Sequence, residues 1–566
     1  MSAANLTSNF APDLAPDLII FNARVMTMNA ENPRYEAVAV RDGRIIATGT
    51  NAEIRVLADS ATIIIDARGG TVLPGFSENH MHIFSGAAEL DHLQLGGVLG
   101  LEALSAAILA YAHSRPSQKF LFAQSCEYEV LGKGKPLNRH VLDAILPDRA
   151  LLVMAPDHHT AWANTLALEW SGILHGKALS TGNEIVMGSD GLATGVLLEM
   201  EAFGPIQKAG GFDRYRLGLA TGGEPEPFPD EATFRIDMDV MRMGLAHCAR
   251  HGITSVQNMD GNFYQLQLLE AIEKEDGFLS ARLKIPFHYK PHMPFSMLDR
   301  AVEMTERYNS DFLSSGMVKV FFDGVLDSYT AVMLDDYADK PGTRGTALMT
   351  AEYFSNLAIE IDKRGLQIAV HAIGDGAVRA VFDGYEAAQK ANGIRDARHR
   401  IEHVEIIHAD DVHRFEALSV IASMQPPHAP GAMDFPNGPT IDVLGEKRWP
   451  LAFAWRTLKQ AGARIPFSSD WPVSDINVLR GIQAAITRQC WGSEPDQRFT
   501  LQEALEAYTL EGAYAEFAED KKGKIKTGFF ADLVILSGDI EETAPDKLHE
   551  LHPVVTICNG RITFAF

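Results

Sequence analysis

The stretch "TVLPGFSENHMHIF", residues 71–84, decides the fold, because an apolar run and a Pro-Gly pair lead directly into two histidines. His80 and His82 are separated by one residue, and residues i and i+2 of a strand point to the same side. Both imidazoles can therefore face one cavity and bind one ion. A single pair of this kind is a weak signal, since most strand histidines are satisfied core residues. Whether this pair binds a metal ion therefore depends on further ligands elsewhere in the chain.

Seven further runs rich in Val, Ile and Phe are similar to this first one, and helical stretches such as "AVRAVFDGYEAAQKAN" separate several of them. The runs cover residues 252–260, 281–290, 316–324, 366–375, 399–407, 420–428 and 463–471. Strands that alternate with helices predict a parallel sheet, and eight such units predict an α/β fold with a (β/α)₈ barrel. Thr500 and Glu503 have the spacing of a capping box, and we expect Asp375 to cap a helix.

Both chain ends contain short strands joined by tight turns. Asp42-Gly43 lies between two apolar runs, and Asn559-Gly560 has the same position in "VVTICNGRITFAF". Each pair predicts a β-hairpin, because a type I′ turn needs positive φ at both central positions. Unpaired edge strands are a liability, so the economical arrangement is one small β-sandwich built from both ends of the chain.

These patterns divide the chain into regions. We expect a loose tail over residues 1–16, the β-sandwich over 17–72 and 522–566, and the catalytic barrel over 73–521. Residues of about 100–240 are too many for one helical crossover between the first two barrel strands. They predict a subdomain, inserted after the first strand, that covers or lines the site or forms an interface. The exposed insertion and the sandwich are compatible with a homodimer.

Composition restricts the function classes. The formal net charge is −24 over 566 residues, which argues against nucleic acid and anionic membranes as partners, because both are negative. The four cysteines form no CxxC pair, so we expect reduced thiols and no cysteine-based zinc site. There is no basic leader followed by an apolar stretch, and no apolar run approaches the roughly 18 residues that span a bilayer. We expect a cytoplasmic protein that acts on a small molecule.

Polar residues occupy the C-terminal ends of the predicted strands, where the active sites of (β/α)₈ barrels form. They are His80, His82, Lys319, His371, His403, His428 and Asp470. Neutral imidazole suits zinc and similar metals, and aspartate adds an anionic oxygen, although Asp470 could also cap a helix. Lys319 is unexpected beside a cation unless its amine has reacted with CO₂ to give an anionic carbamate that bridges two metals. It could instead pair with an acid, bind phosphate or form a Schiff base.

Seven stretches carry a resemblance to a known family. They are "VLPGFSENHMH", "VKVFFDG", "VHAIGDGAV", "RIEHVEI", "MQPPH", "FSSDWPV" and "GFFADLVIL". Through them the sequence resembles the metal-dependent amidohydrolase superfamily, and most closely its amidohydrolase family 3 branch, which includes N-substituted formamide deformylase. The stretches cover the barrel and the flanking β domain, and they are specific for the family but weakly specific for a substrate. Glu78 departs from the family's usual aspartate, and we expect it to lie behind the metal ligands.

The resemblance implies a centre of one or two divalent ions, with zinc as the first candidate. The implied ligands are His80, His82 and Asp470 for the first ion, and His371 and His403 for the second, with carboxylated Lys319 as the bridge. It also implies an enzyme that hydrolyses carbon–nitrogen bonds other than peptide bonds, through attack of a metal-bound hydroxide on an N-acyl or N-formyl amine. Asp470 would act as general base and then acid, and His428 is our candidate for stabilising the oxyanion.

Four residues are candidates for substrate contact. The resemblance suggests that the inserted segment "DHHTAWANTLAL" reaches the site, which makes His159 a candidate. Trp471 follows Asp470 directly, and Phe84 and Phe322 are candidates for apolar walls. Such walls would favour a bulky or aromatic group on the substrate, although aromatic residues more often belong to the core.

Two other functions stay open. A hydrolase or deaminase of a cyclic amide, urea or carbamate would use the same fold, but the mononuclear deaminases of this superfamily generally lack the bridging lysine. Lys319 therefore favours amide hydrolysis. A non-catalytic relative would be expected to have lost metal ligands, and here all six positions are filled.

Overall fold

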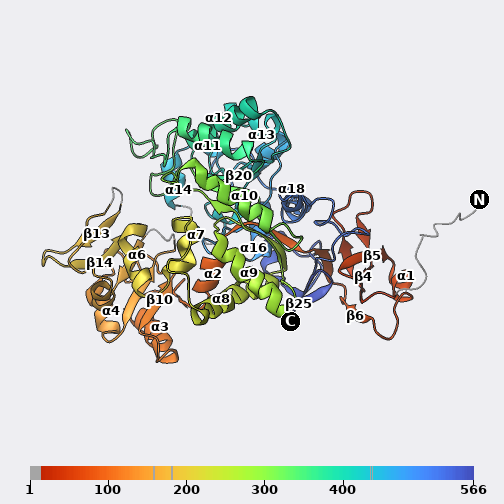
Figure 1. Ribbon diagram of the computed structural model, residues 1–566, viewed down its shortest axis with the longest axis horizontal. Coiled ribbons are helices and arrows are strands. Elements are labelled where there is room, and N and C mark those ends of the chain that lie inside the picture. The colour runs from red at the N-terminus through yellow and green to blue at the C-terminus, as the bar shows by residue number, and fades with distance from the viewer. Residues whose placement is uncertain (1–14, 157–159, 180–182, 434, 436–437) are drawn as a thin grey trace, which may run out of the picture.

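Two parallel sheets form the centre of the molecule (Figure 1). The computed structural model describes residues 15–156, 160–179, 183–433, 435 and 438–566. One sheet has the order β18-β16-β15-β8 and the other the order β17-β19-β20-β21-β22. Their strands are β8 Phe76–Met81, β15 Ile253–Asn258, β16 Arg282–Lys284, β17 Phe287–His288, β18 Leu313–Ser314, β19 Met317–Phe321, β20 Gln367–Ala372, β21 Arg400–His403 and β22 Ile421–Ser423. Every neighbouring pair is parallel, as the alternating pattern predicts.

Prolines interrupt two of the predicted strands. The third divides into β16 and β17 on either side of Pro286, because proline lacks the N–H that a central ladder needs. The eighth, 463–471, contains Pro466 and forms no regular strand, contrary to the prediction. Within the described ranges it meets β22 and the residue after it through single parallel bridges, Arg464 with Ile421 and Phe467 with Met424.

The irregular eighth segment nevertheless reaches the first strand. The Asp470 N–H donates to the carbonyl of His80 (2.9 Å), and the His82 N–H donates to the carbonyl of Trp471 (2.8 Å). Among the described residues no sheet closes on itself, but these two bonds hold the end of the segment against the end of β8. The two histidines and the aspartate therefore meet.

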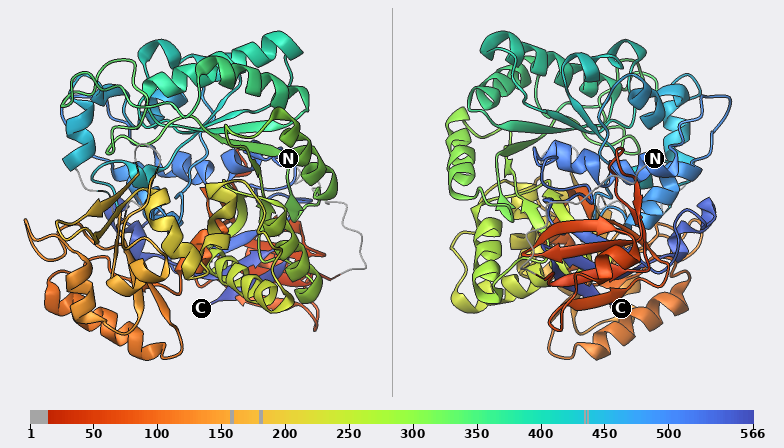
Figure 2. Two further views of the ribbon diagram at one scale, coloured as in Figure 1. Left: turned by 60° about the vertical axis from the view of Figure 1, so that its left-hand side comes forward. Right: turned by 90° about the vertical axis from the view of Figure 1, so that its right-hand side faces the viewer.

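Helices follow most of the parallel strands and lie outside them (Figure 2). They are α2 Ile83–Glu89, α8 Glu231–Arg250, α9 Phe263–Asp276, α10 Leu298–Arg307, α11 Ala351–Lys363, α12 Asp375–Asn392, α13 Arg414–Ala417, α14 Gly438–Leu444, α15 Trp455–Gln460, α16 Val478–Thr487, α17 Leu501–Ala507 and α18 Leu510–Ala515. Thr500 and Glu503 form the predicted capping box of α17. Asp375 is not a cap, because Gly374 precedes α12 and the Asp375 carboxylate accepts the N–H of Leu334 (2.8 Å) instead.

The two chain ends form two further sheets. Their orders are β5-β4-β1-β6 and β25-β24-β23-β7-β2-β3. The elements are β1 Leu18–Phe21, β2 Arg24–Met26, β3 Arg34–Tyr35, β4 Ala37–Arg41, β5 Arg44–Gly49, α1 Asn51–Arg55, β6 Ile63–Asp66, β7 Thr71–Pro74, β23 Leu533–Leu536, β24 Pro553–Cys558 and β25 Arg561–Ala565. Ile20 and Val38 of the first sheet share one hydrophobic cluster with Val72 and Ile535 of the second, so both ends of the chain contribute to one small core.

Both predicted hairpin turns are present in these sheets. The turns join β4 to β5 and β24 to β25, which pair as antiparallel strands. Positive φ at both central positions is the property that a type I′ turn requires. The values are 47° at Asp42, 72° at Gly43, 51° at Asn559 and 74° at Gly560. Local turn chemistry therefore determines the register at both ends of the chain.

A fifth sheet lies between β8 and α8 in the sequence. Its order is β13-β14-β12-β11-β10-β9, and in Figure 1 it lies at the opposite end of the molecule from β4 and β5. Its elements are β9 Leu93–Gln94, α3 Leu101–Ser114, β10 Phe120–Gln124, α4 Arg139–Ile145, β11 Ala150–Met154, β12 Thr160–Ala163, α5 Thr165–Trp170, β13 Glu184–Met187, β14 Ala193–Leu198, α6 Met200–Ala209 and α7 Leu217–Ala220. It has a hydrophobic cluster of its own, which includes Leu104, Leu121 and Leu151.

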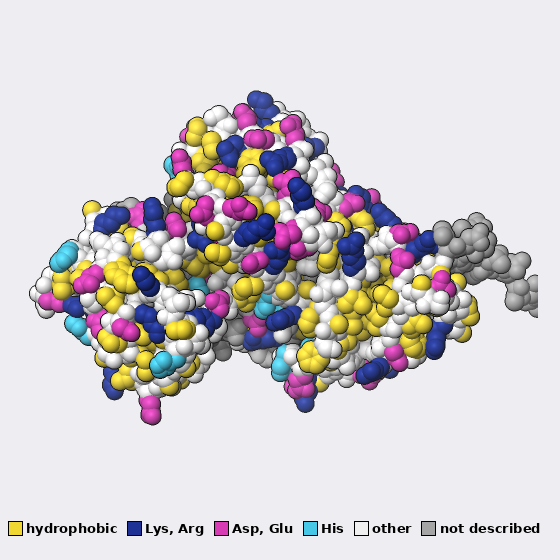
Figure 3. All heavy atoms as spheres, turned by 60° about the horizontal axis from the view of Figure 1, so that its bottom comes forward, with side chains coloured by type: hydrophobic (Ala, Val, Ile, Leu, Met, Phe, Trp, Pro, Cys, Tyr) yellow, Lys and Arg dark blue, Asp and Glu magenta, His cyan; other side chains and the backbone are white. Residues whose placement is uncertain are grey.

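The charged surface, the cysteines and the helices can be compared with the expectations from the composition. On the face shown in Figure 3, acidic and basic side chains are interspersed with hydrophobic ones, so the acidic excess does not form a single patch there. All four cysteines are free, as the sequence predicts. No helix in the described ranges is long and apolar enough to cross a membrane.

Candidate metal centre

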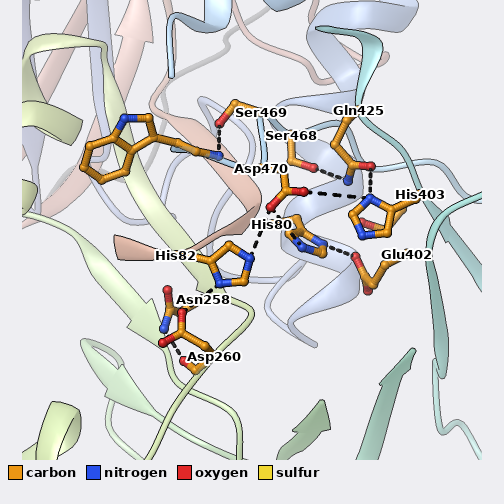
Figure 4. A network of polar contacts seen from close by, with 12 residues as sticks. His80, His82, Asn258, Asp260, Glu402, His403, Gln425, Ser468, Ser469 and Asp470 are labelled. Carbon is orange, nitrogen blue, oxygen red and sulfur yellow. Dashed lines mark hydrogen bonds and ion pairs between the residues drawn. The ribbon is translucent and has the colours of Figure 1, made fainter. Parts of the chain in front are cut away.

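The first two histidines and the aspartate form one buried cluster (Figure 4). His80 lies on β8, and His82 directly follows this strand and precedes α2. Asp470 Oδ1 lies 3.4 Å from His80 Nε2 and 3.2 Å from His82 Nε2. The i and i+2 spacing thus brings both rings to one side of the strand, as the sequence predicts.

Two carboxylates orient the two rings. Glu402 accepts the Nδ1–H of His80 (2.7 Å), and Asp260 accepts the Nδ1–H of His82 (2.9 Å). A proton on Nδ1 leaves Nε2 as the nitrogen available to a metal, and carboxylates behind metal-binding histidines commonly have this role. Both Nε2 atoms face Asp470 Oδ1, so three potential ligand atoms converge.

The charges of this cluster fit a cation. Asp470 Oδ1 is buried and has no assigned hydrogen-bond partner in the described part of the chain, although both Nε2 atoms lie within 3.4 Å of it. Burial raises the pKa of Asp470, but His80, His82 and His403 lower it well below its usual value. Burial lowers the pKa of His82, but Asp260 and Asp470 raise it to about 9. Two carboxylates therefore hold a proton on His82, and a metal ion can replace that proton.

A second group shares the same aspartate. His403, His428 and Asp470 have potential ligand atoms that all lie within 4.8 Å of one another. Gln425 Oε1 accepts the Nδ1–H of His403 (2.8 Å), which leaves its Nε2 available. The buried Nε2 of His428 has no hydrogen-bond partner among the described residues, and its Nδ1 lies 3.6 Å from Glu405 Oε1.

His371 lies beside this second group. Its ring centroid is 4.4 Å from that of His403. Its Nε2–H donates to the carbonyl of Gly324 (3.1 Å), so Nδ1 is the nitrogen left for a ligand. Burial and the charge of Lys319 lower the pKa of His371 to about 3, which favours the neutral ring that metals bind. His371 as a ligand of the second ion and His428 as the residue that stabilises the oxyanion both remain predictions.

Lys319 lies inside the cluster. It belongs to β19, its side chain is fully buried, and its Nζ has no hydrogen-bond partner in the described ranges. Burial lowers its pKa to about 8, although Glu402 and Asp470 oppose this effect. A buried, unpartnered amine of this kind is chemically suited to the carbamate predicted from the sequence, because an amine must be neutral to react with CO₂.

Two backbone positions at the centre have unusual conformations. His403 has a φ of 77° and Asp470 a φ of 61°, and both are non-glycine residues. Left-handed backbone is uncommon outside glycine, and it is enriched at functional sites where the surroundings hold it. Glu78 contributes to this restraint, because its carboxylate accepts the N–H of Ser469 (2.7 Å), next to Asp470. It therefore lies behind the ligands, as expected.

The candidate substrate contacts have different surroundings. Trp471 is buried, and its ring centroid lies 5.2 Å from that of His247. His159 lies outside the described residues. Contact of either residue with a substrate therefore remains a prediction.

The two candidate apolar walls lie in the main hydrophobic core. The ring centroid of Phe84 is 5.0 Å from that of Tyr215, and the ring centroid of Phe322 is 5.8 Å from that of Phe354. These contacts explain both aromatic side chains by packing in the core. A role as pocket walls stays a prediction for Phe84 and Phe322.

Sequence reasoning missed the residues behind the ligands. Arg400 is fully buried and donates to both carboxylate oxygens of Glu402 (2.7 and 3.0 Å). It also donates to Gln257, to the Asn79 carbonyl (2.7 Å) and to Ser423 (2.9 Å). One guanidinium thus joins β8, β15, β21 and β22 beneath the centre. The motif "RIEH" could have indicated these contacts, since a charged pair inside a buried strand needs partners.

Comparisons with known proteins agree with this geometry. The amidohydrolase family matches residues 64–564. The chain therefore belongs to the amidohydrolase family, and it contains buried histidine–aspartate groups that could hold a metal ion.

Similar proteins cover almost the whole chain. N-substituted formamide deformylase of Arthrobacter pascens is 26% identical over 565 residues, which cover 97% of this chain and 98% of that protein. Protein LONG AFTER FAR-RED 3 of Arabidopsis thaliana is 28% identical over 537 residues, which cover 93% of this chain and 88% of that protein. An uncharacterized metal-dependent hydrolase from Pyrococcus horikoshii OT3 has a similar structure, with a TM-score of 0.72 and 22% identity over 94% of this chain and 98% of that one.

Proposed function

We propose that this chain is a metal-dependent hydrolase that cleaves the carbon–nitrogen bond of a small amide other than a peptide, an N-acyl or N-formyl amine. The observation that carries the proposal is Asp470, which belongs to both histidine groups. A carboxylate between two such groups can contact a metal ion and a reacting water at the same time. The name of the Arthrobacter pascens relative supports the substrate class.

We further propose that the two parallel sheets and the segment 463–471 form one distorted (β/α)₈ barrel. The bonds between that segment and β8 support closure. In this architecture the barrel spans 73–521, with the insertion at about 100–240. The sheets of the two chain ends form a β-sandwich over 17–72 and 522–566, which their shared hydrophobic cluster supports.

The residues present suit one or two ions of zinc or a similar metal. We assign the first ion to His80, His82 and Asp470, whose ligand atoms converge. We assign the second to His371 and His403, with a CO₂-derived carbamate on Lys319 as the bridge. The buried, unpartnered Nζ of Lys319 supports this assignment.

The chemistry follows from the position of Asp470. A divalent ion held there supplies Lewis acidity, which lowers the pKa of a water and polarises a substrate carbonyl. The Asp470 carboxylate, through the oxygen that does not face His80 and His82, accepts a proton from the water that attacks the carbonyl carbon. It then gives this proton to the amine nitrogen as the C–N bond breaks, so that an acid and an amine leave. His428 lies beside Asp470 and can donate a hydrogen bond to the oxyanion.

The surroundings of the substrate stay part of the proposal. In this proposal His159 and Trp471 contact the substrate, and Phe84 and Phe322 form apolar walls of its pocket. We expect the chain to act on a small molecule in the cytoplasm and to bind neither nucleic acid nor a membrane. The chain associates as a homodimer.

The test combines metal content with turnover. We expect one or two transition-metal ions per chain in protein purified with bicarbonate and without chelator, together with hydrolysis of N-formyl or N-acyl arylamines. A matched His80→Ala variant should lose metal and turnover together. Ring opening of a cyclic amide, or hydrolysis of a urea or carbamate with release of ammonia or an amine, without hydrolysis of open-chain N-acyl or N-formyl amines, would favour the alternative. Protein that neither contains nor takes up zinc or manganese would refute the proposal.

A further inference from the structure

The end of the third strand directs two side chains to one side. His288 belongs to β17, and Lys290 follows two residues later. The ring centroid of His288 lies 5.3 Å from that of Phe321, and Lys290 Nζ lies 5.2 Å from the same centroid. Tyr289, between them, is fully buried on the other side, where its hydroxyl contacts that of Tyr353 (2.7 Å). Strand alternation therefore turns Lys290 toward Phe321.

This side belongs to the candidate metal centre. The ring of Phe321 stacks on that of His371, with centroids 4.7 Å apart. Lys319 Nζ lies 4.8 Å from the centroid of Phe321. Lys290 and Lys319 thus approach the same ring as His371, so the Lys290 amine borders the cluster.

Lys290 has no anionic partner among the described residues, where its Nζ contacts the ring of Phe321. Asp260, the carboxylate whose charge raises the pKa of Lys290, already binds His82 (2.9 Å) and Gln265 (2.8 Å). Burial, and then the charge of Lys319, lower the pKa of Lys290 to about 8.

His288 does not supply the missing charge. Its Nδ1–H donates to the carbonyl of Gly218 (2.8 Å), and its buried Nε2 has no partner among the described residues. Burial and the charges of Lys290 and Lys319 lower the pKa of His288 well below its usual value. Once Lys319 carries the proposed carbamate, Lys290 is the ammonium left at the end of the third strand, and no carboxylate of the described residues pairs with it. Placing a cation in such surroundings is costly unless an anion arrives to pair with it.

We propose that Lys290 binds a carboxylate of the substrate, so that the enzyme selects N-acyl or N-formyl compounds with an acid group, such as N-acyl amino acids. This inference rests on the proposed function, because the carboxylate must lie beside the amide that the metal centre cleaves. A charge-assisted hydrogen bond of this kind selects the acid over a neutral analogue by roughly 10- to 100-fold.

The experiment separates binding from turnover. Calorimetry on the metal-loaded full chain measures N-methylsulfonylphenylalanine and its carboxylate-free analogue N-(2-phenylethyl)methanesulfonamide, neither of which has an amide to hydrolyse. The variants are Lys290→Met, Lys290→Arg and the control Lys390→Met. Lys390 is a suitable control because its side chain is 74% exposed and pairs only with Glu386 (3.5 Å) in the described ranges.

We expect wild-type protein and Lys390→Met to prefer the acid. Lys290→Met should weaken binding of the acid by roughly 10- to 100-fold and leave the neutral analogue unchanged, while Lys290→Arg should keep most of the preference. The inference is overturned if wild-type protein shows no preference, if Lys290→Met keeps it, or if that variant loses metal and binds both compounds equally poorly. The last result would make Lys290 a partner of the Lys319 carbamate.

Turnover distinguishes this failure from failure of the proposed function. Hydrolysis of N-formylphenylalanine is measured in parallel with the same variants. Binding that depends on Lys290, without hydrolysis of this or other amides, would refute amide hydrolysis but leave the carboxylate subsite standing. Hydrolysis with no role for Lys290 in either measurement would refute the subsite and leave amide hydrolysis standing.

Discussion

Glu402→Gln should weaken metal binding although Glu402 touches no proposed substrate. In the native protein its two oxygens accept from Arg400, and one of them also accepts from His80 Nδ1 (2.7 Å). Arg400 offers only donors, and a glutamine replaces one acceptor oxygen by an NH₂ donor. Whichever way the amide turns, two donors face each other. His80 or Arg400 then lacks its partner in a fully buried position.

The size of the effect follows from this geometry. Loss of a carboxylate behind a metal-binding histidine typically costs about 10- to 100-fold in metal affinity. This range corresponds to about 1.4–2.8 kcal/mol. Breaking one partner of a buried ion pair costs about 3–5 kcal/mol of folding stability, because Arg400 keeps its charge in a dry environment. Both quantities should therefore fall in the one variant.

Chelator competition measures the metal dissociation constant, and urea unfolding measures stability. The control is Glu519→Gln, since Glu519 pairs with Arg398 (2.8 Å) but its side chain is 41% exposed. That change should cost at most about 1 kcal/mol and leave metal affinity unchanged. Native metal affinity in Glu402→Gln would show that His80 is oriented without this carboxylate, and the reasoning would fail.

Three further predictions concern the same centre and its surroundings. Lys319→Ala should lose activity that short-chain carboxylic acids partly restore, and full activity without added acid would exclude a bridging role. His82 has a pKa of about 9, above its usual 6.5, so its proton stabilises the metal-free fold below pH 6.5, and this stabilisation disappears as pH rises toward 9. Metal affinity, measured by titration, should accordingly rise up to about tenfold per pH unit from pH 7 to 9, and a flat profile would contradict this. Gly374→Ala should destabilise by about 1–3 kcal/mol in urea unfolding, because its Cβ would lie 2.1 Å from the backbone oxygen of Val332, whereas Gly204→Ala meets nothing within 4 Å and should not destabilise.

Patterns that are local in sequence predicted much of the fold. The hairpins at Asp42-Gly43 and Asn559-Gly560 form because adjacent residues alone determine the turn. Most of the parallel strands form where apolar runs occur. The eighth does not, since Pro466 removes an N–H and the segment is held by single bridges and side-chain contacts instead. Such support comes from distant residues, and a strand pattern does not show it.

The sequence likewise predicted the potential ligands of the candidate site but not the residues that support them. His80 and His82 stand at the end of β8, and two backbone hydrogen bonds hold the segment that carries Asp470 against that end, where a strand end was predicted. Their supporting partners were missed because Glu402 lies 322 residues from His80. Glu402 and His403 are also neighbours, and neighbours on a regular strand face opposite sides. The φ of 77° at His403 removes this regularity and allows both to serve the same centre.

The meeting of β8 with the segment around Asp470 has a consequence for synthesis of the chain. A ribosome makes His80 and His82 early, whereas Asp470 emerges only after the parallel strands of both central sheets. The nascent chain therefore has two imidazoles long before it has the carboxylate that completes their cluster. A metal ion bound by these three residues would link the beginning of the chain to its end only after synthesis is nearly complete. It would stabilise the finished protein by mass action. Proteins truncated before Asp470 should lack this metal-mediated link, even if their other strands pair correctly.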